Sequence, residues 1–108
     1  IHFEGPDECG HQGNAKEKIQ AIEWLDEKCL APLMQALDDK GEDYNILLMP
    51  DHATPLELRT HTAEAIPYIL YKKNQTLEHH AEHYDENHAK TTGKVEEKAW
   101  DLMARLLA

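Results

Sequence analysis

Two short, continuous apolar runs constrain the fold of this chain more than any other feature. The first covers residues 44–49, Tyr-Asn-Ile-Leu-Leu-Met, and ends at Pro50; the second covers residues 66–71, Ile-Pro-Tyr-Ile-Leu-Tyr. A short run without polar alternation is typical of a strand buried on both faces, as in a parallel sheet. We therefore expect two strands, the first buried and parallel. Pro67 is acceptable because it lies near the start of the second strand.

Apolar residues at helical spacing lie on both sides of these runs. The first pattern covers residues 15–37, and Asn14 is placed to cap it with Glu17 as the capping-box partner. Pro32 interrupts this pattern and predicts a kink or a split. A further helix is expected over residues 95–107. This order predicts an α/β fold, with a layered sheet and flanking helices.

Four smaller expectations complete the secondary structure and the core. Residues 2–4 could end a strand, and the glycines among residues 5–13 predict a turn there. Residues 72–92 are polar and histidine-rich, which predicts loop with a helical turn at most. Trp24 and Trp100 occupy helical positions, and we expect them in the core.

Length and composition limit the class of protein. A chain of 108 residues can form one domain with a thin core. It opens on Ile1 without a methionine, so we expect residues 1–108 to be a single partial domain of a longer protein. The net charge of -10 argues against nucleic acid and against an anionic membrane as partners. Cys9 and Cys29 lack metal-ligand spacing and the density of a disulfide scaffold, which favours a reducing cytoplasm.

Carboxylate and imidazole side chains cluster in three short segments beside the expected strands. The loops that follow parallel strands converge on one edge of a sheet, where ligands bind. The candidate ligands from these segments are Asp7, His11, Asp51, His52 and His61. Mixed ligands of this kind suit zinc, manganese or iron better than calcium. The sequence therefore predicts a metal centre.

These segments also resemble the archaeal-type, 2,3-bisphosphoglycerate-independent phosphoglycerate mutases of the alkaline phosphatase superfamily. The motifs that carry the resemblance are Pro-Asp-Glu-x-Gly-His at residues 6–11, Leu-Met-Pro-Asp-His-x-Thr-Pro at 48–55, and Leu-Arg-Thr-His-Thr at 58–62 followed by Ile-Pro-Tyr at 66–68. The match is closest over residues 1–71 and looser to the C-terminus. It implies the C-terminal portion of an alkaline-phosphatase-like phosphotransferase domain.

The resemblance implies a role for each candidate ligand. Asp7, His11 and His61 would bind a first divalent ion, and Asp51 with His52 would bind a second. The family completes the second site with an upstream aspartate and a serine nucleophile, neither of which has a counterpart here. The parent would use two ions (manganese, zinc, or magnesium or cobalt), of which this chain would hold at most one well.

The implied reaction is the interconversion of 3-phosphoglycerate and 2-phosphoglycerate through a phosphoserine, a step of glycolysis and gluconeogenesis. The isolated chain would be inactive, because no catalytic serine is present. Ala53 stands where the family pattern has proline, and Ala65 follows Glu64 where Asp-Pro is frequent. Two alternatives therefore stay open: a homoserine kinase or another phosphotransferase of the same superfamily, and a stand-alone, non-catalytic metal-binding or interaction module.

The remaining polar residues have weaker assignments. Arg59 could contact a substrate phosphate or pair with a carboxylate, and Glu8 could orient a ligand histidine or be exposed. The four histidines of the polar stretch, His79, His80, His83 and His88, are expected to be solvated rather than to bind metal. A truncated sheet would expose an edge, so we also expect a homo-oligomer or a strand swap.

Overall fold

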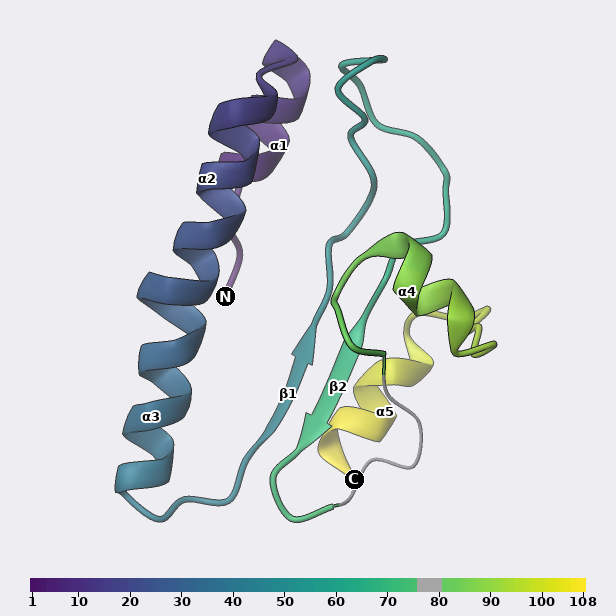
Figure 1. The fold of residues 1–108 in the computed structure, drawn as a ribbon. Helices are drawn as coiled ribbons and strands as arrows, with labels where there is room; N and C mark the ends of the chain where they lie inside the picture. The colour runs from purple at the N-terminus through teal and green to yellow at the C-terminus, as the bar shows by residue number, and fades with distance from the viewer. Residues whose placement is uncertain (76–80) are drawn as a thin grey trace. The chain divides into compact units, whose positions relative to one another are not determined.

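The structure is a computed structural model that describes residues 1–75 and 81–108 and divides into two compact units. The first unit comprises Ile1–Glu42 and His52–Ala65, and the second comprises Asp43–Asp51 and Ile66–Ala108. His79 and His80 lie outside the described residues. Figure 1 shows the elements in chain order: α1 (Gly5–Gln12), α2 (Ala15–Leu25), the π-helical turn η1 (Asp26–Leu30), α3 (Ala31–Asp39), β1 (Asn45–Leu48), β2 (Ile69–Lys72), α4 (Glu86–Thr91) and α5 (Asp101–Leu107). The presence of several helices and a small antiparallel sheet confirms the α/β class.

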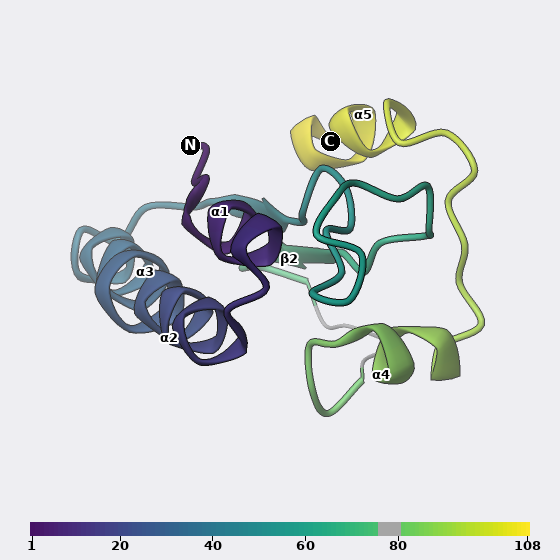
Figure 2. The same ribbon diagram turned by 90° about the horizontal axis from the view of Figure 1, so that it is seen from above.

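Residues 5–12 form helix α1, so the expectation of a glycine-rich turn is wrong, as is that of a strand end at residues 2–4. Pro6 lies in the first turn, where its missing N–H costs nothing, and Asp7 and Glu8 complement the positive end of the helix dipole. Gly13 then ends the helix in the left-handed conformation, with φ 67°. The helix packs against α2 (Figure 2).

The helical pattern predicted over residues 15–37 forms α2 and α3, with the π-helical turn η1 between them. The Asn14 side chain caps α2 by accepting a hydrogen bond of 3.1 Å from the backbone N–H of Glu17, as predicted. The π-helical turn Asp26–Leu30 ends two residues before Pro32, and the backbone N–H of Ala31 donates to the carbonyl of Asp26. A π-helical turn contains one extra residue between the hydrogen-bonded backbone groups. This extra residue explains how the helix continues through Pro32, which was expected to kink or split it.

Strands β1 and β2 pair antiparallel, which corrects the expectation of a parallel first strand. The register runs from Asn45 opposite Lys72 to Leu48 opposite Ile69. Parallel strands need a crossover connection, which is usually a helix. The chain between β1 and β2 contains no helix, and all of its residues are described. The second strand starts at Ile69, beyond Pro67, because proline cannot donate to the strand ladder.

Helix α5 packs on β1 and is shorter than the predicted 95–107 helix, since it begins only at Asp101. Leu102 of α5 is buried, with 2% of its surface exposed. By contrast Trp24 is 50% exposed and Trp100 is 72% exposed, so their assignment to the core is wrong. The core is therefore thin, as the length predicted. None of the helices in residues 1–75 and 81–108 has the length and apolar content to span a bilayer.

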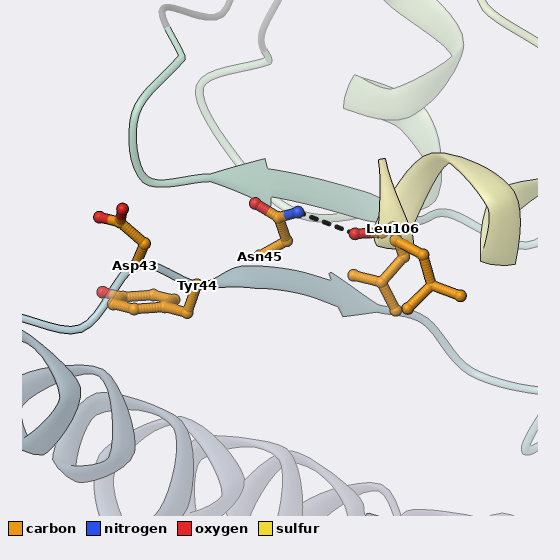
Figure 3. A pocket seen from close by; sticks show the side chains of 5 residues that line it. Asp43, Tyr44, Asn45 and Leu106 are labelled. Atoms are coloured by element: carbon orange, nitrogen blue, oxygen red, sulfur yellow. Dashed lines mark hydrogen bonds between the residues drawn. The ribbon is translucent and has the colours of Figure 1, made fainter.

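The C-terminal end of α5 is held by a side chain of β1. Asn45 Nδ2 donates a hydrogen bond of 2.8 Å to the backbone carbonyl of Leu106 (Figure 3). This carbonyl belongs to the last turn of the helix, which has no intrahelical partner for its carbonyls. The shallow pocket lined by Asp43, Tyr44, Asn45, Leu106 and Leu107 lies around this contact. The amide thus serves as a tertiary cap for α5.

Replacing Asn45 with aspartate should destabilise the second unit by about 1 kcal/mol. The change removes the donor and places a negative charge at the negative end of a helix dipole. Urea unfolding followed by circular dichroism measures the effect. Asn87→Asp is the matched control, because Asn87 lies in the first turn of α4, where a negative charge is favourable. Equal stability of the two variants would contradict the capping role.

Candidate metal centre

Asp7, His11 and His61 form a three-residue group whose ligand atoms all lie within 4.8 Å of one another. His11 Nε2 lies 3.2 Å from Asp7 Oδ2, and His61 Nε2 lies 3.3 Å from Asp7 Oδ1. The two imidazole Nε2 atoms are 3.2 Å apart. Three donors from segments about 50 residues apart in sequence therefore point at one small volume.

Helix α1 and the 52–65 loop supply these side chains in different ways. Asp7 and His11 are four residues apart on α1, so they lie on the same face one turn apart. His61 arrives from the loop, which is closed on itself by the antiparallel bridge between Ala53 and Thr62. The backbone N–H of Thr62 donates 3.0 Å to the carbonyl of Ala53. This bridge fixes the residue next to His61.

A backbone carbonyl selects the tautomer of His11. His11 Nδ1 lies 2.9 Å from the carbonyl oxygen of Arg59. A carbonyl only accepts, so Nδ1 donates to it, and in the neutral imidazole the lone pair then lies on Nε2, the atom that faces Asp7 and His61. Arg59 adopts a left-handed backbone with φ 52°, which is uncommon for a residue with a side chain. Gly13 makes room for its side chain, because a Cβ there would lie 2.6 Å from Arg59 Nε.

Thr54 holds the carboxylate of the group. Its hydroxyl donates a hydrogen bond of 2.5 Å to Asp7 Oδ1. This bond lowers the pKa of Asp7 below its ordinary value of 3.8; the nearby imidazoles act in the same direction and burial opposes them. A lowered pKa in the folded state means that the ionised carboxylate stabilises the fold above pH 3.8. That contribution is lost as the pH falls through the lower folded value.

A third imidazole, His52, lies against the group rather than within it. Its ring stacks on that of His61 with centroids 3.6 Å apart and an interplanar angle of 28°. His52 Nδ1 is 3.2 Å from the Thr54 hydroxyl. Asp51 belongs to the second compact unit, and its assignment as a ligand stays a prediction. The same holds for Arg59 and the exposed Glu8 as substrate or orienting residues.

Sequence reasoning missed two residues that position the group, Thr54 and Lys18. Lys18 Nζ donates 2.8 Å to the backbone carbonyl of Thr54, and Thr54 is only 6% exposed. Thr54 stands inside the Asp-His-x-Thr-Pro motif at residues 51–55. The available signal was a hydroxyl two residues after the candidate ligand His52, but only the fold brings it close to Asp7.

The donor set fits a small divalent ion. Four ligands at about 2.0–2.1 Å from a tetrahedral zinc ion lie about 3.3–3.4 Å from one another. The two imidazole Nε2 atoms, 3.2 Å apart, have about that spacing, and each lies 3.2 or 3.3 Å from a different oxygen of the Asp7 carboxylate. One carboxylate and two imidazoles are also a common zinc set, which leaves a coordination position for water or substrate. The ionised Asp7 and the Nε2 lone pair of His11 are in the form that metal binding needs.

Comparison with known proteins agrees with this chemistry. The family model described as "Metalloenzyme superfamily" matches residues 1–102. The chain belongs to the metalloenzyme superfamily, whose members use divalent metal ions.

Individual relatives narrow the similarity from this superfamily to one kind of enzyme. The chain is 35% identical over 107 residues to a 2,3-bisphosphoglycerate-independent phosphoglycerate mutase of Methanosarcina mazei, covering 99% of this chain and 27% of that protein. It is 39% identical, with the same coverage, to a probable mutase of this kind in Geobacter sulfurreducens. A mutase of Methanothermobacter thermautotrophicus is 49% identical over 70 residues, which are 65% of this chain and 17% of that protein. The resemblance seen in the motifs is confirmed. The chain spans about a quarter of the length of these first relatives, and no solved structure matches it.

The close approach of α1 to the Thr54 loop generates a prediction about Gly10. A Cβ on Gly10 would lie 2.7 Å from the Thr54 carbonyl oxygen and 2.9 Å from its methyl carbon. Gly10→Ala should therefore cost about 1–3 kcal/mol of folding stability, as overpacking does. Urea unfolding measures it.

Gly5→Ala on the same helix is the matched control. Its added Cβ would lie 3.9 Å from the Cβ of Ala21, an ordinary contact, so stability should be kept. If Gly10→Ala unfolds at the same urea concentration as Gly5→Ala, the close packing described here is wrong.

Proposed function

We propose that this chain is the metal-binding part of a two-metal phosphoglycerate mutase, which interconverts 3-phosphoglycerate and 2-phosphoglycerate through a phosphoserine. The convergence of Asp7, His11 and His61 on one volume carries the proposal. The names of the relatives support the reaction and the phosphorylated small-molecule substrate. A reducing cytoplasm is the location we propose with it.

Within this proposal, Asp7, His11 and His61 hold the first ion. Asp51 and His52 contribute part of a second site, as the family motifs imply. Paired divalent ions neutralise the charge that builds up on the phosphoryl oxygens during transfer. The chain's own residues position the ions: Arg59 sets the tautomer of His11 through its carbonyl, and Thr54 orients the carboxylate of Asp7.

The nucleophile must come from outside these residues. The chain contains no serine, so it cannot form a phosphoserine. Only part of the second site is supplied here, so we propose that the isolated chain binds one ion well and is catalytically inactive. Manganese, zinc, magnesium and cobalt all remain candidates for that ion, because Asp and His sites follow metal availability as much as affinity. Association through a strand edge stays a prediction.

Calorimetric titration of the 108-residue chain with zinc tests the metal site. We expect one tight site per chain, and a loss of at least about a hundredfold in affinity for His11→Ala, since even residues that only orient a ligand cost ten- to a hundredfold. His2→Ala is the matched control, because His2 is an exposed histidine of the same unit whose contact is with Glu4. Two tight sites, or equal affinity in both variants, would contradict the assignment.

Activity assays test the reaction itself. The longer protein that contains this chain should convert 3-phosphoglycerate to 2-phosphoglycerate with manganese present, whereas the 108-residue chain alone should not. The same longer protein supplied with homoserine and ATP should give no phosphorylated homoserine. Turnover of homoserine without mutase activity would replace the proposed substrate, and turnover by the isolated chain would show that the nucleophile is not a serine.

A further inference from the structure

Thr54 is the buried polar residue around which the candidate metal centre is arranged. It is 6% exposed, and its hydroxyl lies within hydrogen-bonding distance of two side chains. Asp7 Oδ1 is 2.5 Å away, and His52 Nδ1 is 3.2 Å away. One hydroxyl thus contacts a residue of the first proposed metal site and a residue of the second.

Counting protons assigns a direction to each contact. A hydroxyl has one proton and two lone pairs, and a short bond to an ionised carboxylate is the stronger of the two contacts. The proton of Thr54 therefore goes to Asp7, and the hydroxyl oxygen can only accept from His52 Nδ1. This places the proton of His52 on Nδ1 and its lone pair on Nε2. His11 has the same arrangement, with the Arg59 carbonyl as acceptor.

The rest of Thr54 is fixed as tightly as its hydroxyl. Its backbone carbonyl accepts a hydrogen bond of 2.8 Å from Lys18 Nζ. Its methyl group lies over Gly10, where a Cβ would come within 2.9 Å. These contacts hold the residue against helices α1 and α2, so the hydroxyl has little freedom to turn away from Asp7.

We infer that Thr54 is a positioning residue that joins the two proposed metal sites: its hydroxyl orients the Asp7 carboxylate of the first and selects the metal-binding tautomer of His52 in the second. This inference rests on the proposed function for the identity of the sites, and on the contacts alone for the tautomer. Second-layer hydrogen bonds of this kind fix ring orientation and raise ligand basicity.

Two substitutions separate the hydroxyl from the shape of the side chain. Thr54→Val keeps the branched shape and removes the hydroxyl, whereas Thr54→Ser keeps the hydroxyl and removes the methyl group. Nitrogen-15 NMR of the metal-free chain should show His52 as the Nδ1–H tautomer in the wild type and in Thr54→Ser, and a shift toward Nε2–H in Thr54→Val. Zinc titration should show about a ten- to hundredfold weaker site in Thr54→Val, with near wild-type affinity in Thr54→Ser.

The outcomes distinguish this inference from the proposed function. If Thr54→Val keeps both the His52 tautomer and the zinc affinity, the inference is overturned while the metal site stands. If the wild type binds no zinc, the proposed function fails, and the tautomer of His52 still decides the role of Thr54. Circular dichroism verifies folding, and Thr54→Ala provides a second hydroxyl-free variant should valine prevent it. A similar loss of affinity in Thr54→Ser would mean that packing, and not the hydroxyl, matters.

Discussion

A hydrogen bond of 2.5 Å between Thr54 and Asp7 links helix α1 to a loop 47 residues further along the chain. The first unit has few buried apolar side chains with which to make that connection. Polar contacts between α1, α2 and the loop do it instead: Lys18 to the Thr54 carbonyl and His11 to the Arg59 carbonyl. The same bonds that close the fold here orient the donors of the metal centre, so local stability and metal geometry depend on the same residues.

Because the same hydrogen bonds serve the fold and the site, a chain this polar can hold an organised site. Each contact places a donor opposite a carbonyl or a carboxylate, and the glycines at positions 10 and 13 let the backbones and the Arg59 side chain come close enough. A bound ion would add to this network, because an ion that binds the folded chain and not the unfolded one stabilises the fold by mass action. Metal binding and folding of the first unit are therefore expected to be coupled.

The sequence predicted the parts of the structure that follow from local chemistry. The Asn14 cap and the approximate positions of the two strands were readable from the residue pattern, and the grouping of Asp7, His11 and His61 was implied by the family motifs. The direction of the strands and the exposure of Trp24 and Trp100 were not, because both depend on which surfaces the chain has available to pair with. Thr54 was missed because its importance comes from a contact that only the tertiary fold creates.

X-ray absorption spectroscopy of the zinc-loaded chain identifies the atoms bound to the ion, and so shows whether Asp7, His11 and His61 hold it. We expect two imidazole nitrogens and a carboxylate oxygen at about 2.0–2.2 Å from the ion. In a variant that lacks both His11 and His61, the imidazole signals should be lost. A sulfur neighbour at about 2.3 Å, which would indicate Cys9 or Cys29, or a spectrum unchanged by loss of the two histidines, would contradict it.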